Sequence, residues 1–119
     1  MSGELYAIGL NHRSAPVDLR EQLAVADDDH ARVLAGLREH AGLVEAMVVS
    51  TCNRIEIYAV AGGAFGPERV LPVLAELQRA RTQDIVDHAF VRASSDAARH
   101  ICRVTASLES MAVGEPQIL

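Results

Sequence analysis

A cysteine and an arginine two positions apart have the residue types and spacing best suited to chemistry in this sequence. Cys52 lies within Ser50-Thr51-Cys52-Asn53-Arg54, a polar break between two runs of strand-forming residues. A thiolate is a strong nucleophile, and a nearby cation favours its formation. Arg54 offers that cation, or a two-pronged donor for a substrate carboxylate, and Thr51 offers a hydroxyl. The pattern predicts nucleophilic acyl chemistry at Cys52; a plain turn with a solvent-facing cysteine is the alternative.

The second cysteine and the histidines give weaker signals. Cys102 falls on the expected apolar side of a C-terminal helix, so we expect a small buried hydrophobe there. His100 lies on a different face of that helix, with Val104, and is either a polar rim residue or a partner of Cys52. His12 and Arg13 follow the first strand and are expected near the hairpin, because strand ends gather at one edge of a sheet. The spacing of the two cysteines and five histidines predicts no metal site.

Composition limits the class of protein. With 119 residues, half of them hydrophobic, the chain fits one domain, residues 1–119. A formal net charge of −5 and the absence of tryptophan argue against nucleic-acid binding led by phosphates or by base stacking. No apolar run is long enough to span a bilayer, and the first residues do not resemble a signal peptide. We therefore expect a cytoplasmic protein without a membrane segment.

The elements that must position these residues follow from periodicity and turn signals. Strands are predicted at residues 5–10, 43–50, 54–60 and 88–92, and the second and third form a hairpin around Cys52. Helices are predicted from the aspartates at 27–29 to Gly42, within 67–81 where Pro72 kinks or starts the helix, and from Ser94 or Ser95 to Gly114. This order predicts an α+β fold of the split βαβ (ferredoxin-like) type. Such a fold has an antiparallel sheet with helices on one face, here with an extra C-terminal helix.

Three segments together resemble the N-terminal catalytic domain of the glutamyl-tRNA reductases. They are GLNHRSAPV at residues 9–17, STCNRIEIY at 50–58, and the stretch from His100 that ends in GEPQIL at 114–119. The similarity extends over essentially the whole chain. One mild departure is Ala106-Ser107-Leu108-Glu109-Ser110, where the family usually has Ser-Gly-Leu-Asp-Ser.

The resemblance implies an activity and a set of site residues. The family reduces glutamyl-tRNA to glutamate-1-semialdehyde with NADPH, the first step of tetrapyrrole (porphyrin) synthesis from glutamate. Cys52 matches the nucleophile that holds glutamate as a thioester, and His100 matches a histidine beside the substrate. Further matches to substrate-binding residues are Thr51, Arg54, Ser110 and Gln117, and more weakly the first-loop residues Asn11, His12 and Ser14.

The resemblance also implies partners and a cofactor, and the sequence lacks the motif that would bind that cofactor. The family is a homodimer that passes its product to glutamate-1-semialdehyde aminomutase, and its NADPH is bound by a separate domain. The chain contains no GxGxxG fingerprint, so we expect no cofactor-binding residues in it. The chain alone is expected to accept or hydrolyse the glutamyl group and not to reduce it.

Two other functions fit the residues without the resemblance. One is a self-contained cysteine-dependent acyl hydrolase or transferase, with Cys52 and His100 as a dyad. The other is a non-enzymatic module that binds a small ligand. The first should turn over an ester without a reductant, and the second should keep its binding after Cys52 is alkylated.

Overall fold

One antiparallel sheet of four strands organises the chain. The computed structural model describes residues 3–62 and 66–114, with side chains as far as residue 108. The strands are β1 (Glu4–Asn11), β2 (Glu45–Ser50), β3 (Arg54–Ala61) and β4 (Phe90–Ala93). They lie in the order β2-β3-β1-β4, and every neighbouring pair is antiparallel. The antiparallel sheet expected from the sequence is confirmed, and β2 and β3 form the expected hairpin.

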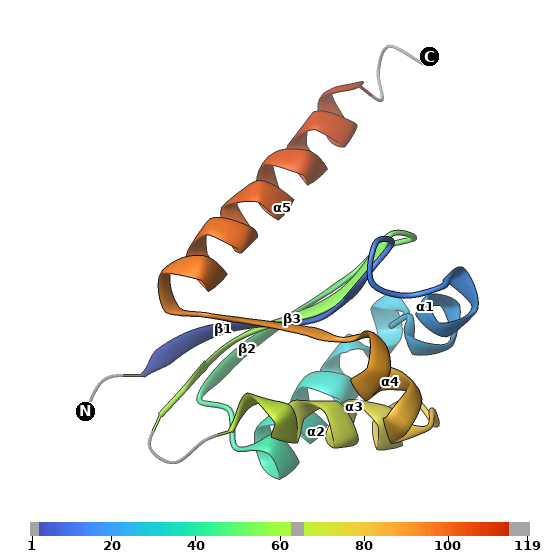
Figure 1. Ribbon diagram of the computed structural model, residues 1–119, viewed down its shortest axis with the longest axis vertical. Helices are drawn as coiled ribbons and strands as arrows, with labels where there is room; N and C mark the ends of the chain where they lie inside the picture. The colour runs from blue at the N-terminus through green and yellow to red at the C-terminus, as the bar shows by residue number, and fades with distance from the viewer. Residues whose placement is uncertain (1–2, 63–65, 115–119) are drawn as a thin grey trace.

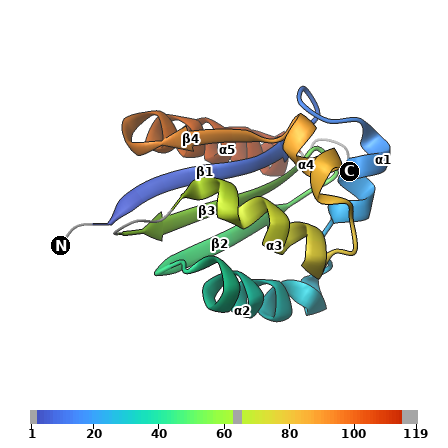
Figure 2. The same cartoon turned by 60° about the horizontal axis from the view of Figure 1, so that its bottom comes forward.

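Within the described residues, five α-helices cover the two faces of this sheet unequally. The helices α1 (Val17–Leu23), α2 (His30–Ala41), α3 (Val70–Leu77) and α4 (Thr82–His88) lie on one face. The single long helix α5 (Ser94–Gly114) crosses the opposite face and continues beyond it (Figure 1). Figure 2 shows β4 leading directly into α5, which runs back over β1. The C-terminal helix thus supplies a second layer instead of joining the others.

The alternation of side chains along the central strands divides the core between these layers. On β1, Ile8 and Leu10 pack toward α1–α4, whereas Ala7 packs toward α5. On β3, Ile57 and Tyr58 divide in the same way. Successive side chains of a strand point to opposite faces of the sheet, so both faces of β1 and β3 are covered.

The connections follow the sequence signals in part. Gly42 ends α2 in the left-handed conformation, with φ of 74°, which a glycine adopts without strain. Pro72 lies in the first turn of α3, after a short 3₁₀ turn (Pro67–Arg69), where its missing N–H costs no helical hydrogen bond. The helix α4 was not predicted; it is seven residues long and fully buries only Ile85, so its hydrophobic period is weak.

The buried side of α5 differs from the one expected. Ala97 and Val104 are fully buried against the sheet, and Ile101 and Leu108 pack around them. Cys102 is exposed, so the prediction of a buried cysteine is wrong. Within the described ranges, no helix has the length and apolar character needed to cross a membrane.

Candidate active site

The hairpin loop between β2 and β3 is closed by local hydrogen bonds. The Thr51 N–H donates to the Arg54 carbonyl at 2.8 Å, and the Asn53 N–H donates to the Thr51 hydroxyl oxygen at 3.1 Å. Asn53 does not adopt the left-handed conformation that asparagine often takes in tight turns. The Thr51 side chain shapes the loop instead, and its hydroxyl hydrogen stays available as a donor.

Cys52 is exposed at the tip of this loop, as the sequence predicts. Its backbone is held from α1, because Arg20 Nη1 donates to the Cys52 carbonyl at 2.6 Å. Arg20 Nε donates in addition to the Ala15 carbonyl at 3.2 Å, which fixes the guanidinium between the two segments. Sequence reasoning missed Arg20, because 32 residues separate it from Cys52 and no local pattern links them. The thiol is therefore free while its main chain is braced.

A buried glutamate lies four residues after the cysteine and joins three side chains. Glu56 has no exposed surface. Its Oε2 accepts from Arg54 Nη1 at 2.6 Å, and its Oε1 accepts from the Tyr58 hydroxyl at 2.9 Å and lies 2.6 Å from His100 Nε2. A buried carboxylate needs such donors to offset its desolvation. We call Glu56, Arg54, Tyr58 and His100 the Glu56 network.

Glycine on the neighbouring strand leaves room for this network. Gly9 on β1 lies directly opposite Glu56 on β3. A Cβ at Gly9 would lie 2.7 Å from the Glu56 Cα and 3.0 Å from its Cγ, closer than atoms pack. Burial raises the pKa of Tyr58, and the negative charge of Glu56 and its hydrogen bond raise it further. Tyr58 is therefore a protonated donor to the carboxylate.

His100 belongs to the sheet-facing side of α5. Its side chain is 13% exposed, and its ring contacts Phe90 at 5.1 Å and meets Tyr58 edge-on at 6.4 Å between centroids. The interpretation of His100 as a polar rim residue is wrong. Because a carboxylate only accepts hydrogen bonds, Nε2 carries the proton in this contact. In the neutral form of the ring with this tautomer, Nδ1 is an acceptor.

Arg54 is less free than the sequence suggests. Its side chain is 13% exposed, and Nη1 is committed to Glu56. The remaining guanidinium donors stay available, and Arg54 lines a cavity of about 480 Å³. The residues that share this cavity come from the first loop, from β4 and from α5: Asn11, His12, Arg13, Ser14, Phe90, Arg92, His100, Arg103, Val104 and Ser107.

The first loop reaches this cavity because Asn11 pairs with Arg54 across β1 and β3. The Asn11 side-chain oxygen accepts from the backbone N–H groups of Arg13 and Ser14, at 2.9 and 3.1 Å. The Ser14 hydroxyl oxygen accepts in return from the Asn11 N–H at 3.0 Å. The sequence prediction that His12 and Arg13 gather at the hairpin's edge of the sheet agrees with this register. Cys52 does not line the cavity; it precedes Arg54, which does, by two residues.

Two predicted substrate contacts, Ser110 and Gln117, have side chains outside the part of the chain that the structure describes. Ser110 lies on α5, ten residues after His100, which is about 15 Å along the helix axis at 1.5 Å per residue. Gln117 lies outside the described residues. Among the residues that the structure describes, no cluster of histidine, cysteine and acidic side chains is arranged to hold a metal ion.

These features define a class: an α+β domain with an antiparallel sheet, an exposed cysteine on a hairpin, and a buried carboxylate that anchors a histidine and an arginine beside a cavity. The model of the family "Glutamyl-tRNAGlu reductase, N-terminal domain" matches residues 8–119. Glutamyl-tRNA reductases from Syntrophotalea carbinolica and Halorhodospira halophila are 42% and 44% identical over 113 and 115 residues. These matches cover 94% and 97% of this chain, and 26% and 25% of those proteins.

A solved structure agrees with the sequence relatives. Glutamyl-tRNA reductase from Methanopyrus kandleri superposes with a TM-score of 0.63 at 32% identity, over 96% of this chain and 25% of that one. The chain belongs to the glutamyl-tRNA reductase family and corresponds to its N-terminal domain. It spans about a quarter of the length of the relatives it matches.

Proposed function

We propose that this chain is the acyl-accepting part of a glutamyl-tRNA reductase, in which Cys52 takes the glutamyl group from tRNA as a thioester. The observation that carries the proposal is the exposed Cys52 on a loop braced by Arg20, next to a cavity that Arg54 and His100 line. Family membership supports the substrate class. The strand order, with each βαβ unit split by another strand, supports a ferredoxin-like classification.

The acyl transfer is a nucleophilic acyl substitution, in which the thiolate adds to form a tetrahedral intermediate before the leaving group departs. The Cys52 thiolate attacks the ester carbonyl carbon, and a C–S bond forms. The ester C–O bond then breaks, and the ribose oxygen leaves with its electron pair and takes up a proton. A thioester is more electrophilic toward hydride than an oxygen ester, which divides one difficult reduction into two easier steps.

Arg54 and Thr51 are proposed to recognise the glutamyl group. The Arg54 donors that Glu56 does not engage suit the substrate's γ-carboxylate, and the Thr51 hydroxyl hydrogen suits a carbonyl oxygen. The Glu56 network fixes the tautomer of His100, so that Nδ1 can accept a hydrogen bond from the substrate's ammonium group or from the leaving ribose hydroxyl. His100 thereby binds or polarises the substrate.

NADPH supplies the hydride that converts such a thioester to an aldehyde. The sequence has no GxGxxG run, which is the fingerprint of such a phosphate-binding loop. These residues do not fit a dinucleotide, so no reductive step is assigned to them. We infer that a nucleotide-binding domain of the kind the family carries would bring the cofactor to Cys52.

The test is mass spectrometry of the chain after incubation with glutamyl-tRNA. We expect a glutamyl adduct on the peptide that contains Cys52, absent in Cys52→Ser and present in Cys102→Ser. The second variant is a matched control, because it removes the other exposed thiol. An adduct on both cysteines, or on neither, would contradict the proposal.

The adduct has a predictable fate without a reductant. We expect slow hydrolysis of glutamyl-tRNA by the chain alone, lost in Cys52→Ser and unchanged by NADPH. Semialdehyde formation that depends on NADPH would show a cofactor site in these residues. Fast multiple turnover would favour the alternative of a self-contained hydrolase; the contact of His100 Nε2 with Glu56, and not with Cys52, gives that dyad no support.

A further inference from the structure

Four of the chain's arginines gather around one cavity on the α5 side of the sheet, although the chain is acidic overall. The formal net charge is −5, and all eleven basic residues are arginines. Arg13, Arg54, Arg92 and Arg103 line the 480 Å³ cavity, and no acidic residue among those with described side chains lines it with them. The net charge that argued against phosphate binding therefore does not describe this face.

A second hollow continues the first one along α5. It has a volume of about 500 Å³ and shares Arg92, His100 and Arg103 with the cavity beside the first loop. Its further lining includes Arg99 and one acidic residue, Asp96. We call the two hollows together the arginine groove. It extends from the Asn11 loop, next to the hairpin of Cys52, to the start of α5.

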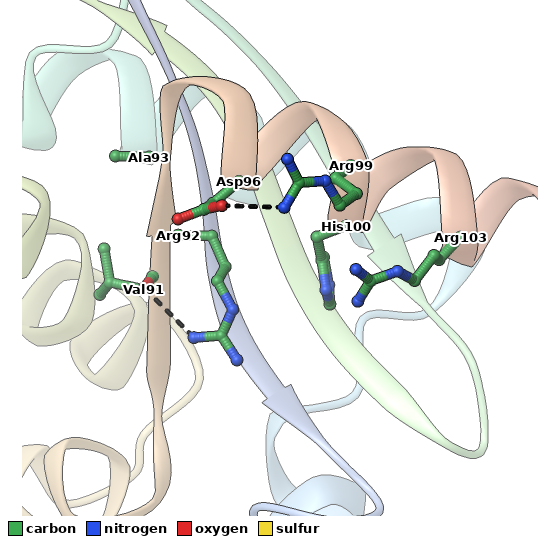
Figure 3. Close-up of a pocket in the computed structure, with 7 residues that line it drawn as sticks. All are labelled: Val91, Arg92, Ala93, Asp96, Arg99, His100 and Arg103. Carbon is green, nitrogen blue, oxygen red and sulfur yellow. Dashed lines mark hydrogen bonds and ion pairs between the residues drawn. The ribbon is translucent and has the colours of Figure 1, made fainter.

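Two arginines of the groove are available for an incoming anion. Among the residues that the structure describes, the Arg103 side chain has no hydrogen bond or ion pair, and the Arg92 side chain has only a 3.4 Å hydrogen bond to the carbonyl of the residue before it. The Arg92 guanidinium lies 5.1 Å from the centre of the Phe90 ring, which supports it from one side. Arg99, in contrast, is paired with Asp96 at 3.4 Å. Figure 3 shows Arg92, His100 and Arg103 extending to the same side, between β4 and α5, while Arg99 turns to Asp96.

The ligand that fits is a chain of phosphodiesters. Guanidinium groups bind phosphate oxygens through two parallel hydrogen bonds, and several arginines along one groove match an anion with repeated charges. A free glutamyl group has one side-chain carboxylate and cannot occupy arginines spread over both hollows. We propose that Arg92 and Arg103, with Arg13 at the loop end, bind the phosphates of the 3′-terminal nucleotides of the aminoacylated tRNA. The inference rests on the proposed function, because the ester at Cys52 places that RNA end beside the groove.

The test separates the RNA from the glutamyl group by using two esters. The 119-residue chain and its Arg92→Gln, Arg103→Gln and Arg38→Gln variants are offered glutamyl-tRNA and 2′(3′)-O-glutamyl-adenosine, which has the ester but no phosphate. Arg38 is a matched control, since it is an exposed arginine on α2, on the opposite face of the sheet. Binding of uncharged tRNA is measured in parallel as a function of salt, and thermal melts check that each variant is folded.

We expect Arg92→Gln and Arg103→Gln each to weaken tRNA binding several-fold and to lower the slope of log K against log salt by about one. The ratio of acylation rates, tRNA ester over adenosine ester, should fall by the same factor, and Arg38→Gln should leave both measures unchanged.

Two results would overturn the proposal that the arginine groove binds tRNA phosphates. One is tRNA binding in the groove variants equal to that of Arg38→Gln, or undetectable in the unmodified chain. The other is an equal loss with both esters, which would place these arginines at the glutamyl group. Failure of the proposed function looks different: the unmodified chain would form no Cys52 adduct with either ester, while the binding measurements would still report on the groove.

Discussion

Glutamine in place of Glu56 removes the one charge that Arg54, Tyr58 and His100 share, while it keeps the size of the side chain. A carboxylate accepts from all three, at 2.6 to 2.9 Å. An amide has one oxygen and one NH₂ group, so it cannot accept on both sides. If its oxygen faces Arg54, the NH₂ group faces Tyr58 and His100, and His100 must then present an unprotonated Nε2. The substitution therefore weakens one contact and reverses another.

The magnitude follows from the burial of these groups. Hydrogen bonds to a charged partner contribute about 1.5 to 3 kcal/mol each, and the amide keeps a weaker form of the Arg54 contact. We expect Glu56→Gln to lower the free energy of unfolding by about 2 to 3 kcal/mol. Glu56→Leu leaves the Arg54 side chain, which is 13% exposed, without its ion-pair partner. We expect this variant to lower the free energy of unfolding by about 3 to 5 kcal/mol. Since domains are stable by roughly 5 to 15 kcal/mol, the glutamine variant should stay folded.

The assay is urea unfolding followed by far-ultraviolet circular dichroism at pH 7. Glu45→Gln is the matched control, because Glu45 is an exposed residue on the adjacent strand β2 and the change in net charge is the same. We expect that control to stay within about 0.5 kcal/mol of the unmodified chain. The acylation rate of Cys52 should fall in Glu56→Gln and not in Glu45→Gln. Equal stability of the two variants would refute the reasoning that the Glu56 network holds the fold at this face.

Three further predictions concern the thiols, a tyrosine and a glycine. Because both cysteines are exposed, iodoacetamide should modify Cys52 and Cys102 alike, and a Cys102 that stays unmodified in mass spectra would contradict this expectation. For the same reason, Cys102→Ala should change the free energy of unfolding by less than about 0.5 kcal/mol. The raised pKa of Tyr58 means that the folded state holds its proton more tightly than the unfolded state, whose pKa is 10.0. The contribution of Tyr58 to stability is complete below pH 10 and is lost as the pH rises further. The melting temperature of Tyr58→Phe should therefore fall less steeply above pH 10 than that of the unmodified chain. Parallel curves of melting temperature against pH for the two proteins would contradict this prediction. Gly9→Ala places a Cβ 2.7 Å from the Glu56 backbone and should lower the free energy of unfolding by about 1 to 3 kcal/mol. The measurement is the melting temperature, which should fall. An unchanged melting temperature would show that β1 and β3 can move apart at this position.

Features that depend on neighbouring residues in the chain were predicted correctly. The polar break at Thr51–Asn53 between two strand-forming runs defined the hairpin and the exposure of Cys52, because a tight turn is a local structure. Gly42 ended its helix as expected, since only the local φ decides that position. The family itself followed from three short motifs. In each case the physical cause lies within a few residues.

The choice of buried face on α5 could not be made from the sequence. The expected and the observed apolar sides share Ile101 and Leu108, and periodicity alone favoured the one that includes Cys102. The tertiary structure buries Ala97 and Val104 instead, which turns Cys102 to solvent and His100 to the sheet. A rotation about the helix axis smaller than the step between successive residues separates the two outcomes, and only the surface that the helix packs against decides between them.

Glu56 and the arginine groove were decided by the tertiary structure alone. In the strand pattern Glu56 alternates with buried isoleucines and reads as a solvated position on the outer face. The crossing of α5 over that face buries it and supplies His100 from 44 residues away, while β4 brings Arg92 beside Arg103. A carboxylate can be buried only where donors surround it, and an anion site needs several cations within reach of one ligand. The sequence alone determined the family and the exposed cysteine that we propose as the nucleophile, because both depend on the types of residues that are neighbours in the chain. The surroundings of that cysteine depend on distances between residues that are far apart in the chain.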